Sequence, residues 1–337
     1  MTEERIHDTA LHISEEAARD GSKLIPENTI LAVVRGMSLA KEFRISITKR
    51  EVAFNQDLKA LACTPEIDPE FIFYSLLAHR NHIRDLATEA SHGTKRLETD
   101  VLAAFRIPIP KDGNLQRRII DILVAYDDLI ENNRRRMVLL EEAARQLYRE
   151  WFVRLRFPGY EHTPITDGVR QGWERVPLGD RVTLNYGKAL KAENRADGHI
   201  PVYGSSGIVG LHDTSLATAP GIVVGRKGNV GSVYWCPNNY WPIDTVYFIG
   251  PDTSNLWLFF ALQHLHFINT DVAVPGLNRD VAYSRPLLIP KSSFVRDFLL
   301  NAEPMFQQIA KLDQMNQKLR AARDLLLPRL MSGEIAV

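Results

Sequence analysis

Hydrophobic positions follow a helical period over the stretch from Leu115 to Val153. Apolar or small residues recur there every three or four positions, and no Gly or Pro interrupts them. These positions are Ile119, Ile122, Tyr126, Leu129, Asn133, Met137, Leu140, Ala144, Leu147 and Trp151, with Asn133 as the polar interruption. At a rise of about 1.5 Å per residue, such a helix spans roughly 58 Å, more than the diameter of a typical domain. We therefore expect a central long helix, residues 114–153, that holds other parts of the chain apart.

A second stretch with the same period runs from Asn301 to Met331. Its apolar positions include Met305, Ile309, Leu312, Leu319, Ala322 and Leu326, and Asn316 is its polar interruption. We expect Pro304 in the first turn, and Pro328 at the end of the helix or at a kink. A long amphipathic helix needs a partner for its apolar stripe, so the two stretches are expected to pair. Ordinary core packing in a helical domain is the alternative for either helix alone.

The sequence on either side of the first helix is a repeat. Leu97, Asp100, Val101, Ile109, Pro110 and Lys111 align with Leu277, Asp280, Val281, Ile289, Pro290 and Lys291 at a constant offset of 180. Arg35-Gly36 aligns loosely with Lys227-Gly228, and Ala143–Arg145 aligns with Ala321–Arg323. A period this long indicates a duplicated domain rather than a solenoid.

The repeat divides the chain into five segments. Mixed segments 1–113 and 173–293 precede the two helices, residues 154–172 are a Pro/Gly-rich linker, and residues 294–337 form the C-terminal helix and tail. We expect a turn that feeds a buried strand within 24–34, strands at 44–48 and 233–236, and helices within 69–82 and 254–267. The second mixed segment opens with WERVPLGD, Trp173–Asp180. The first has no such opening, so we expect it to be short at its N-terminus.

Composition limits the function classes. Lys+Arg and Asp+Glu both number 41, so a basic surface for nucleic acid must be local. The two cysteines lie far apart and indicate no disulfide framework. The first residues are polar and charged, and the apolar runs are too short to span a membrane, so we expect a cytoplasmic protein.

The glycine-rich loop Gly225–Val233 combines residues that are suited to DNA contact. Glycine lets the backbone approach phosphate, Arg and Lys neutralise it, and Asn can read adenine. A tight turn with a solvated basic tip fits this loop alone equally well. The candidate DNA-contacting residues are Arg35, Lys95, Arg96, Lys188, Arg226, Lys227, Asn229, Asn278 and Arg279. Asn278 and Arg279 align with Glu98 and Thr99 of the first half, so these polar positions differ between the two repeats. Two domains with the same backbone pattern but different polar residues could read different DNA sequences.

No catalytic constellation is expected. The chain contains neither a Gly-x-x-x-x-Gly-Lys-Ser/Thr phosphate loop nor the Asn/Asp-Pro-Pro-aromatic motif of amino-methyltransferases. His79 and His82 could share a helix face, but no Cys or carboxylate set accompanies them, so we interpret them as a polar face rather than a metal site.

The layout resembles the specificity (S) subunit of type I restriction–modification enzymes over nearly the whole chain. The motifs are WERVPLGD at Trp173–Asp180, GRKGNVGSV at Gly225–Val233, RIPIP and RPLLIP before the helices, LLEEAARQLYREWFV at the first helix end, and LLLPRLMSGEI in the tail. The resemblance implies an α/β (α+β) fold, with two target recognition domains separated by a pair of long antiparallel coiled-coil helices. The complete family member would have more chain before Ile6.

The resemblance also implies a function without catalysis in this chain. A specificity subunit reads a bipartite DNA target, binds two methyltransferase subunits and translocase–nuclease subunits, and directs adenine methylation and restriction. S-adenosylmethionine, ATP and Mg would lie in those partners, with no cofactor or metal here. The helix seam and partner-binding residues would be Ile122, Tyr126, Leu129, Met137, Leu140, Leu147, Ile309, Leu312, Leu319 and Leu326.

Two rival functions come from other classes. A stand-alone enzyme is disfavoured by the missing catalytic residues. A helical scaffold protein without DNA readout would show no sequence-selective DNA binding once methyltransferase is supplied.

Overall fold

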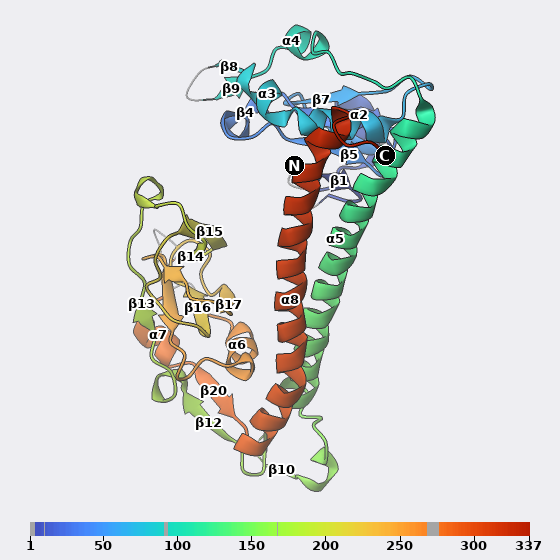
Figure 1. Cartoon of the computed structure of the whole chain (residues 1–337). Helices are drawn as coiled ribbons and strands as arrows, with labels where there is room; N and C mark the ends of the chain where they lie inside the picture. Colours follow the sequence, from blue (N-terminus) through green and yellow to red (C-terminus); the bar gives the residue numbers. More distant parts are fainter. Residues whose placement is uncertain (1–3, 10, 91–93, 167, 268–275) are drawn as a thin grey trace. The chain divides into compact units, whose positions relative to one another are not determined.

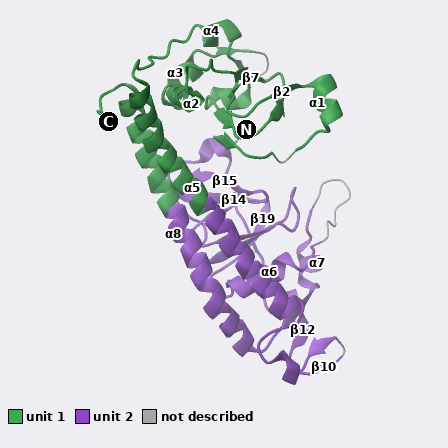
Figure 2. Ribbon diagram, turned by 90° about the vertical axis from the view of Figure 1, so that its right-hand side faces the viewer, with its two compact units in different colours: residues 1–133, 315–337 green, residues 134–314 purple. Residues whose placement is uncertain are grey.

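The computed structural model describes residues 4–9, 11–90, 94–166, 168–267 and 276–337. Helices and strands are mixed, as predicted, and the chain divides into two compact units. Unit 1 comprises residues 1–133 and 315–337, and unit 2 comprises residues 134–314 (Figure 2). The boundary cuts both long helices, so each unit contains one end of each.

The two long helices are present. Helix α5 covers Gly113–Tyr148 and continues as a π-helical turn, Arg149–Val153, while α8 covers Ser292–Met331. Because α8 begins before Asn301, Pro304 lies in the helix interior and not in the first turn as expected. Pro304 removes one backbone hydrogen bond from the helix. The side chains of Phe298 and Ala302 are buried in the core of unit 2 and stabilise α8 at this point.

The helices run antiparallel, side by side (Figure 1). In unit 1 the two polar interruptions meet, since Asn133 Nδ2 donates to Asn316 Oδ1 at 2.9 Å. Asn316 Nδ2 in turn donates to the carbonyl of Ile130 at 3.3 Å. In unit 2 the Phe298 ring packs against Phe152 with ring centroids 5.5 Å apart. The buried asparagines are thus hydrogen-bonded to each other, which favours one register of the helix pair.

The observed seam differs from the predicted one in the first half of α5. Leu312 is buried as predicted, and Ile122, Tyr126, Met137, Leu140, Leu147, Ile309, Leu319 and Leu326 are half-buried. Leu129, however, is 38% exposed and lies outside the seam. The buried positions there are Leu123, Asp127 and Ile130, one residue later than predicted. A carboxylate takes a seam position because charged partners surround it.

Those partners form a buried polar network in unit 1. Arg323, whose side chain is 5% exposed, donates to Asp127 Oδ1 at 2.6 Å and also pairs with Glu4. Tyr74 Oη donates to Asp127 Oδ2 at 2.6 Å. Arg5 donates to Glu70 at 2.7 Å and to Tyr74 Oη at 2.8 Å. The network therefore ties the N-terminal strand to α2, α5 and α8.

The pKa values of this network follow from burial and pairing. Burial alone would lower the pKa of Arg323, but the carboxylates of Glu4 and Asp127 raise it above its ordinary value. Burial raises the pKa of Tyr74, and the charge of Asp127 adds to the effect, so its hydroxyl stays a donor. Burial alone would raise the pKa of Glu70, but hydrogen bonds from Arg5 and Lys49 hold it below its ordinary value. Each buried charge thus has an opposite charge beside it.

The rest of unit 1 is a small α/β assembly. Its main sheet has the order β1-β5-β3-β7, formed by Arg5–Ile6, Ile45–Thr48, Ile30–Val33 and Leu58–Leu61. Two smaller sheets pair β2 (Lys23–Ile25) with β6 (Val52–Phe54), and β4 (Arg35–Gly36) with β9 (Lys95–Arg96) and β8 (Thr88–Glu89). The other helices are α1 (Glu15–Gly21), η1 (Met37–Ala40), α2 (Pro69–Ala78), α3 (Arg80–Asp85) and α4 (Thr99–Ala103). The predicted turn and buried strand within 24–34 are confirmed, since Asn28, with φ of 60°, turns the chain from β2 into the buried strand β3.

Helix α2 covers the main sheet and supplies much of the core. Asp68 caps it by accepting from Glu70 N at 3.0 Å, and Pro69 occupies the first turn. Phe71 and Phe73 are fully buried with Ile30 and Ile47. The predicted helix 69–82 is interrupted after Ala78, and α3 follows.

Unit 2 is built on an antiparallel sheet with the order β13-β19-β16-β17, formed by Asn185–Tyr186, Val246–Ile249, Gly221–Gly225 and Val233–Cys236. A second sheet has the order β15-β14-β18, formed by Gly207–His212, Ile200–Gly204 and Trp241–Pro242. Two-stranded pairs are β10 (Ile165–Thr166) with β11 (Val169–Arg170), and β12 (Glu174–Pro177) with β20 (Pro286–Ile289). Helix α6 (Leu256–Gln263) is shorter than the predicted 254–267, and α7 covers Arg279–Tyr283. Short 3-10 turns lie at Tyr160–His162, Leu178–Asp180 and Ala192–Asn194.

Aromatic residues fill the core of unit 2. The rings of Tyr148, Phe152 and Phe298 from the long helices pack with Phe260 of α6. Phe157 stacks on Trp173 with ring centroids 5.2 Å apart, which holds the expected linker against the opening of the second mixed segment. Among the residues that the structure describes, no helix combines the length and the hydrophobicity needed to cross a membrane.

Candidate nucleic-acid interface

The loop between β16 and β17 has a backbone that only glycine permits. A Cβ on Gly225 would lie 2.1 Å from Asn229 O, and Gly228 and Gly231 have φ of 78° and 76°. The loop closes at its base, where Gly225 N donates to Ser232 O at 2.7 Å. Lys227 and Asn229 are exposed at its tip. The geometry therefore presents a basic residue and an amide at a fixed position.

Arg226 and Arg279 are brought together by one aromatic ring. Both guanidinium carbons lie 5.0 Å from the ring centroid of Tyr186. Arg226 also lies 5.7 Å from the ring of Tyr247, and Arg279 lies 5.9 Å from that of Tyr283. We call these five residues the arginine–tyrosine cluster. Each cation–π contact at such a partly exposed site contributes about 0.5–1 kcal/mol, so the rings hold the guanidiniums in place.

The electrostatics of the cluster favour an anion. In the described part of the chain, neither Arg226 nor Arg279 forms an ion pair with a carboxylate. Lys188, two residues after Tyr186, and Lys227 are exposed. Two guanidiniums that contact one ring, with no carboxylate partner among the described residues, concentrate positive charge there, and this charge favours a bound polyanion.

Tyr247 supports the cluster from below. Its hydroxyl donates to Leu277 O at 3.0 Å, which ties β19 to the segment that carries Arg279. Burial raises the pKa of Tyr247, and the neighbouring Tyr186 adds to the effect, so the hydroxyl remains a donor. Leu277 N donates to Arg226 O at 2.8 Å, which fixes the two arginine-bearing segments beside each other.

Asn278 has a structural role at the start of α7. Its Oδ1 accepts from Asp280 N at 2.8 Å and from Val281 N at 3.3 Å, so it caps the helix. This cap accounts for an asparagine at this position without DNA. Its predicted role in reading DNA stays a prediction, as does that of Asn229.

Three predicted residues lie together in unit 1. In the sheet β4-β9-β8, Arg35 pairs with Arg96 and Gly36 pairs with Lys95. Arg35 and Arg96 are exposed, and Lys95 is half-buried. Arg96 forms an ion pair with Glu98 at 3.1 Å. The structure therefore separates the predicted DNA-contacting residues into one group in unit 1 and another in unit 2.

The two groups occupy equivalent places in the repeat. Leu97 N donates to Val34 O at 2.8 Å, and Leu277 N donates to Arg226 O at the same distance. The bridge between Lys227 and Gly276 corresponds to the pair Arg35 and Arg96. Helices α4 and α7 then follow at the same offset of 180. The sequence alignment of Arg35-Gly36 with Lys227-Gly228 is thus confirmed.

Sequence reasoning missed the tyrosines. Tyr186 is 50% exposed although it is a large aromatic residue, and it precedes Gly187 and Lys188. An aromatic residue beside a basic stretch is the sequence feature that could have marked Tyr186 as part of a binding site. No local pattern, however, indicates that residues 186, 226 and 279 meet.

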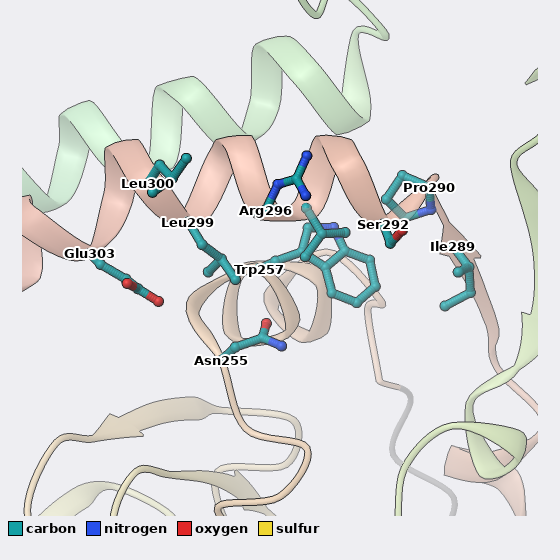
Figure 3. A pocket seen from close by; sticks show the side chains of 10 residues that line it. Asn255, Trp257, Ile289, Pro290, Ser292, Arg296, Leu299, Leu300 and Glu303 are labelled. Atoms are coloured by element: carbon teal, nitrogen blue, oxygen red, sulfur yellow. The ribbon is translucent and has the colours of Figure 1, made fainter.

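A pocket of about 490 Å³ lies elsewhere in unit 2, between α6 and the first turns of α8 (Figure 3). Trp257 of α6 faces Arg296 and Leu299 of α8 across it. Its other lining residues are Asn255, Ile289, Pro290, Ser292, Val295, Leu300 and Glu303. The lining is mostly apolar, and in the described part of the chain no group of three or more His, Cys, Asp or Glu could hold a metal ion.

Comparisons with known proteins agree with this architecture. The family model of the type I restriction modification DNA specificity domain matches residues 9–142. The type I restriction enzyme MjaIX specificity subunit of Methanocaldococcus jannaschii is 23% identical over 361 aligned positions, covering 97% of this chain and 82% of that protein. The EcoR124I/EcoR124II specificity subunit of Escherichia coli is 33% identical over 119 residues, covering 35% of this chain and 29% of the relative.

The fold gives independent support. The type I restriction–modification S subunit from M. genitalium has a crystal structure that matches with a TM-score of 0.54 and 20% identity, covering 91% of this chain and 84% of that one. The chain thus shares the mixed α/β fold of that S subunit, which in this chain includes the two long helices α5 and α8. The matched family model, the similar sequences and this fold agree with one another, and each makes the chain similar to the type I restriction–modification specificity subunits.

Proposed function

We propose that this protein is the DNA-recognition subunit of a type I restriction–modification complex and directs adenine methylation and restriction at a bipartite target. The observation that carries the proposal is the arginine–tyrosine cluster, with two guanidiniums at 5.0 Å from one exposed tyrosine ring and no described carboxylate partner. The equivalent basic sheet of Arg35, Lys95 and Arg96 supplies a second contact region in unit 1.

Each unit would read one part of the target. Exposed Lys188 and Lys227 would neutralise phosphates, which fixes the position of the protein on the duplex without specifying sequence. Side chains that reach base edges in the major groove would then specify the sequence. Because the polar residues at equivalent places differ between the units, the two parts of the target would differ.

Other subunits would supply the chemistry. Two methyltransferase subunits would bring S-adenosylmethionine, and translocase–nuclease subunits would bring ATP and Mg. The long helices offer surface for such partners, since Val138 and Leu139 are each 68% exposed and Leu325 is 69% exposed. Exposed apolar residues of this kind mark protein-interaction surfaces when they gather on one face.

Methylation mapping tests the proposal. The protein is co-expressed with its operon's methyltransferase in a host without adenine methylation, and modified adenines are located by sequencing. We expect one two-part motif, and no motif when the gene for this chain is removed. Methylation without a motif, or complex assembly without methylation, would favour a helical scaffold protein.

A further inference from the structure

We infer that Arg279 reads a guanine in the half-site bound by unit 2, and that Tyr186 is the positioning residue that holds it. This inference rests on the proposed function and adds a residue and a base to it. It follows from the hydrogen bonds that the two arginines make, from the Tyr186 ring that both contact, and from the residues at the equivalent places of unit 1.

The two arginines differ in the donors that remain available. Arg226 uses one terminal amino group, since Nη1 donates to Asp244 O at 3.3 Å. Arg279 makes no side-chain hydrogen bond to the described residues, and its Nε is buried without a partner. Only its two terminal nitrogens can therefore reach a ligand. The end-on contact with guanine O6 and N7 uses the two terminal nitrogens of one guanidinium, and Arg279 has both of them available whereas Arg226 has Nη1 engaged, so we assign the guanine to Arg279 and a phosphate to Arg226.

Rigid elements hold Arg279 in place. It is the first residue of α7, directly after the capping Asn278, and Leu277 is hydrogen-bonded to both Arg226 and Tyr247. Tyr186 then packs against the guanidinium from β13. A side chain fixed in this way loses little conformational freedom on binding, which raises its discrimination between bases.

The other unit lacks this arrangement. At the offset of 180, Thr99 stands in place of Arg279. Val34, which is 5% exposed, takes the place of Arg226, because its carbonyl accepts the equivalent hydrogen bond from Leu97 N. The guanine contact therefore belongs to one half-site. The two units share a frame of backbone hydrogen bonds but differ in the side chains that it presents.

Selection from a randomised DNA library tests the assignment. The complex of this protein with its methyltransferase subunits is incubated with a random duplex library, and bound DNA is sequenced. We expect Arg279→Lys, which keeps the charge but loses the bidentate geometry, to reduce the preference for guanine at one position by roughly 10-fold or more. We expect Tyr186→Leu to weaken the preference at that same position and Tyr186→Phe, which keeps the ring, to restore it.

Arg226→Lys is the matched control, because it is the same substitution at the other arginine that contacts the Tyr186 ring. As a substitution at a phosphate contact, it should change the affinity for all sequences alike and shift the base preference at no single position. Thermal melting by circular dichroism, unchanged in all variants, separates recognition from folding.

The outcomes distinguish this inference from the proposed function. A wild-type complex with no base preference overturns both. A selective wild type whose preferences survive Arg279→Lys, or lose the guanine in Arg226→Lys instead, overturns only the assignment. A preference lost equally in Tyr186→Leu and Tyr186→Phe assigns the contact to the tyrosine hydroxyl and overturns the positioning role.

Discussion

Replacing Arg323 with leucine should destabilise unit 1 and leave unit 2 intact. The Arg323 and Asp127 side chains are 5% and 7% exposed, and the substitution leaves the carboxylate buried without its closest positive partner. Removing one member of a buried ion pair costs about 3–5 kcal/mol. Arg5 Nη2, 3.5 Å from Asp127, and the Tyr74 hydroxyl remain, so we expect the lower end of this range.

Two spectroscopic probes separate the units in a urea titration. All five tryptophans, Trp151, Trp173, Trp235, Trp241 and Trp257, belong to unit 2. Their fluorescence therefore follows unit 2, whereas circular dichroism follows both units. With an m-value of about 2 kcal/mol/M, a loss of about 3 kcal/mol lowers the unfolding midpoint of unit 1 by about 1.5 M urea. The fluorescence midpoint should not move.

A surface pair on the same helix provides the control. Arg329 pairs with Glu334 at 2.8 Å, but the two side chains are 46% and 58% exposed. Arg329→Leu should therefore change stability by less than about 1 kcal/mol. Combining Arg323→Leu with Asp127→Leu removes both buried charges and should recover most of the loss. Equal effects at Arg323 and Arg329, or an equal shift of both spectroscopic probes, would refute the reasoning.

Three further predictions test other parts of the molecule. The pKa of Glu70 is lowered in the folded state, so the carboxylate stabilises unit 1 fully at pH above its unfolded-state pKa, and this stabilisation disappears as pH falls through the folded-state pKa. Glu70→Gln should therefore make the urea midpoint of unit 1 fall less on acidification. Arg226→Ala and Lys227→Ala should weaken DNA binding at all sequences and reduce the salt slope by about one each if they contact phosphate, as gel-shift titrations would measure. Inserting seven residues near Asn133 with seven near Asn316 should lengthen the preferred gap between half-sites by about three base pairs, which methylation mapping would detect.

The sequence predicted elements whose cause is local. Helical periodicity located α5 to within a residue at its start, and the constant offset of 180 aligned the two segments in which the structure has the equivalent helices α4 and α7. Both features depend on the order of residue types along the chain. Element ends were predicted less well, as at α6, because a continuous apolar run does not show where a helix stops.

The candidate site was predicted only in part. Arg226 and Arg279 were expected to contact DNA because of their residue types and positions, but Tyr186 was not. Its contribution depends on two residues distant in sequence that the strands β13 and β16 and the helix α7 bring beside it. Asn278 was expected to read DNA, but its side chain caps α7. Asparagine is a common residue for both roles, so the residue type alone could not distinguish them.

The polar positions of the helix seam show why periodicity alone misplaced it. An apolar seam stabilises several registers that differ by a heptad, since leucine packs against leucine in each. The pairs Asn133 with Asn316 and Asp127 with Arg323 remove this freedom in unit 1, because a slip of seven residues would leave two amides and two charges buried without partners. The predicted seam passed through Tyr126 and Leu129 because a charged residue was assigned to solvent. The residue that appeared least suited to the seam is thus one of those that specify its register.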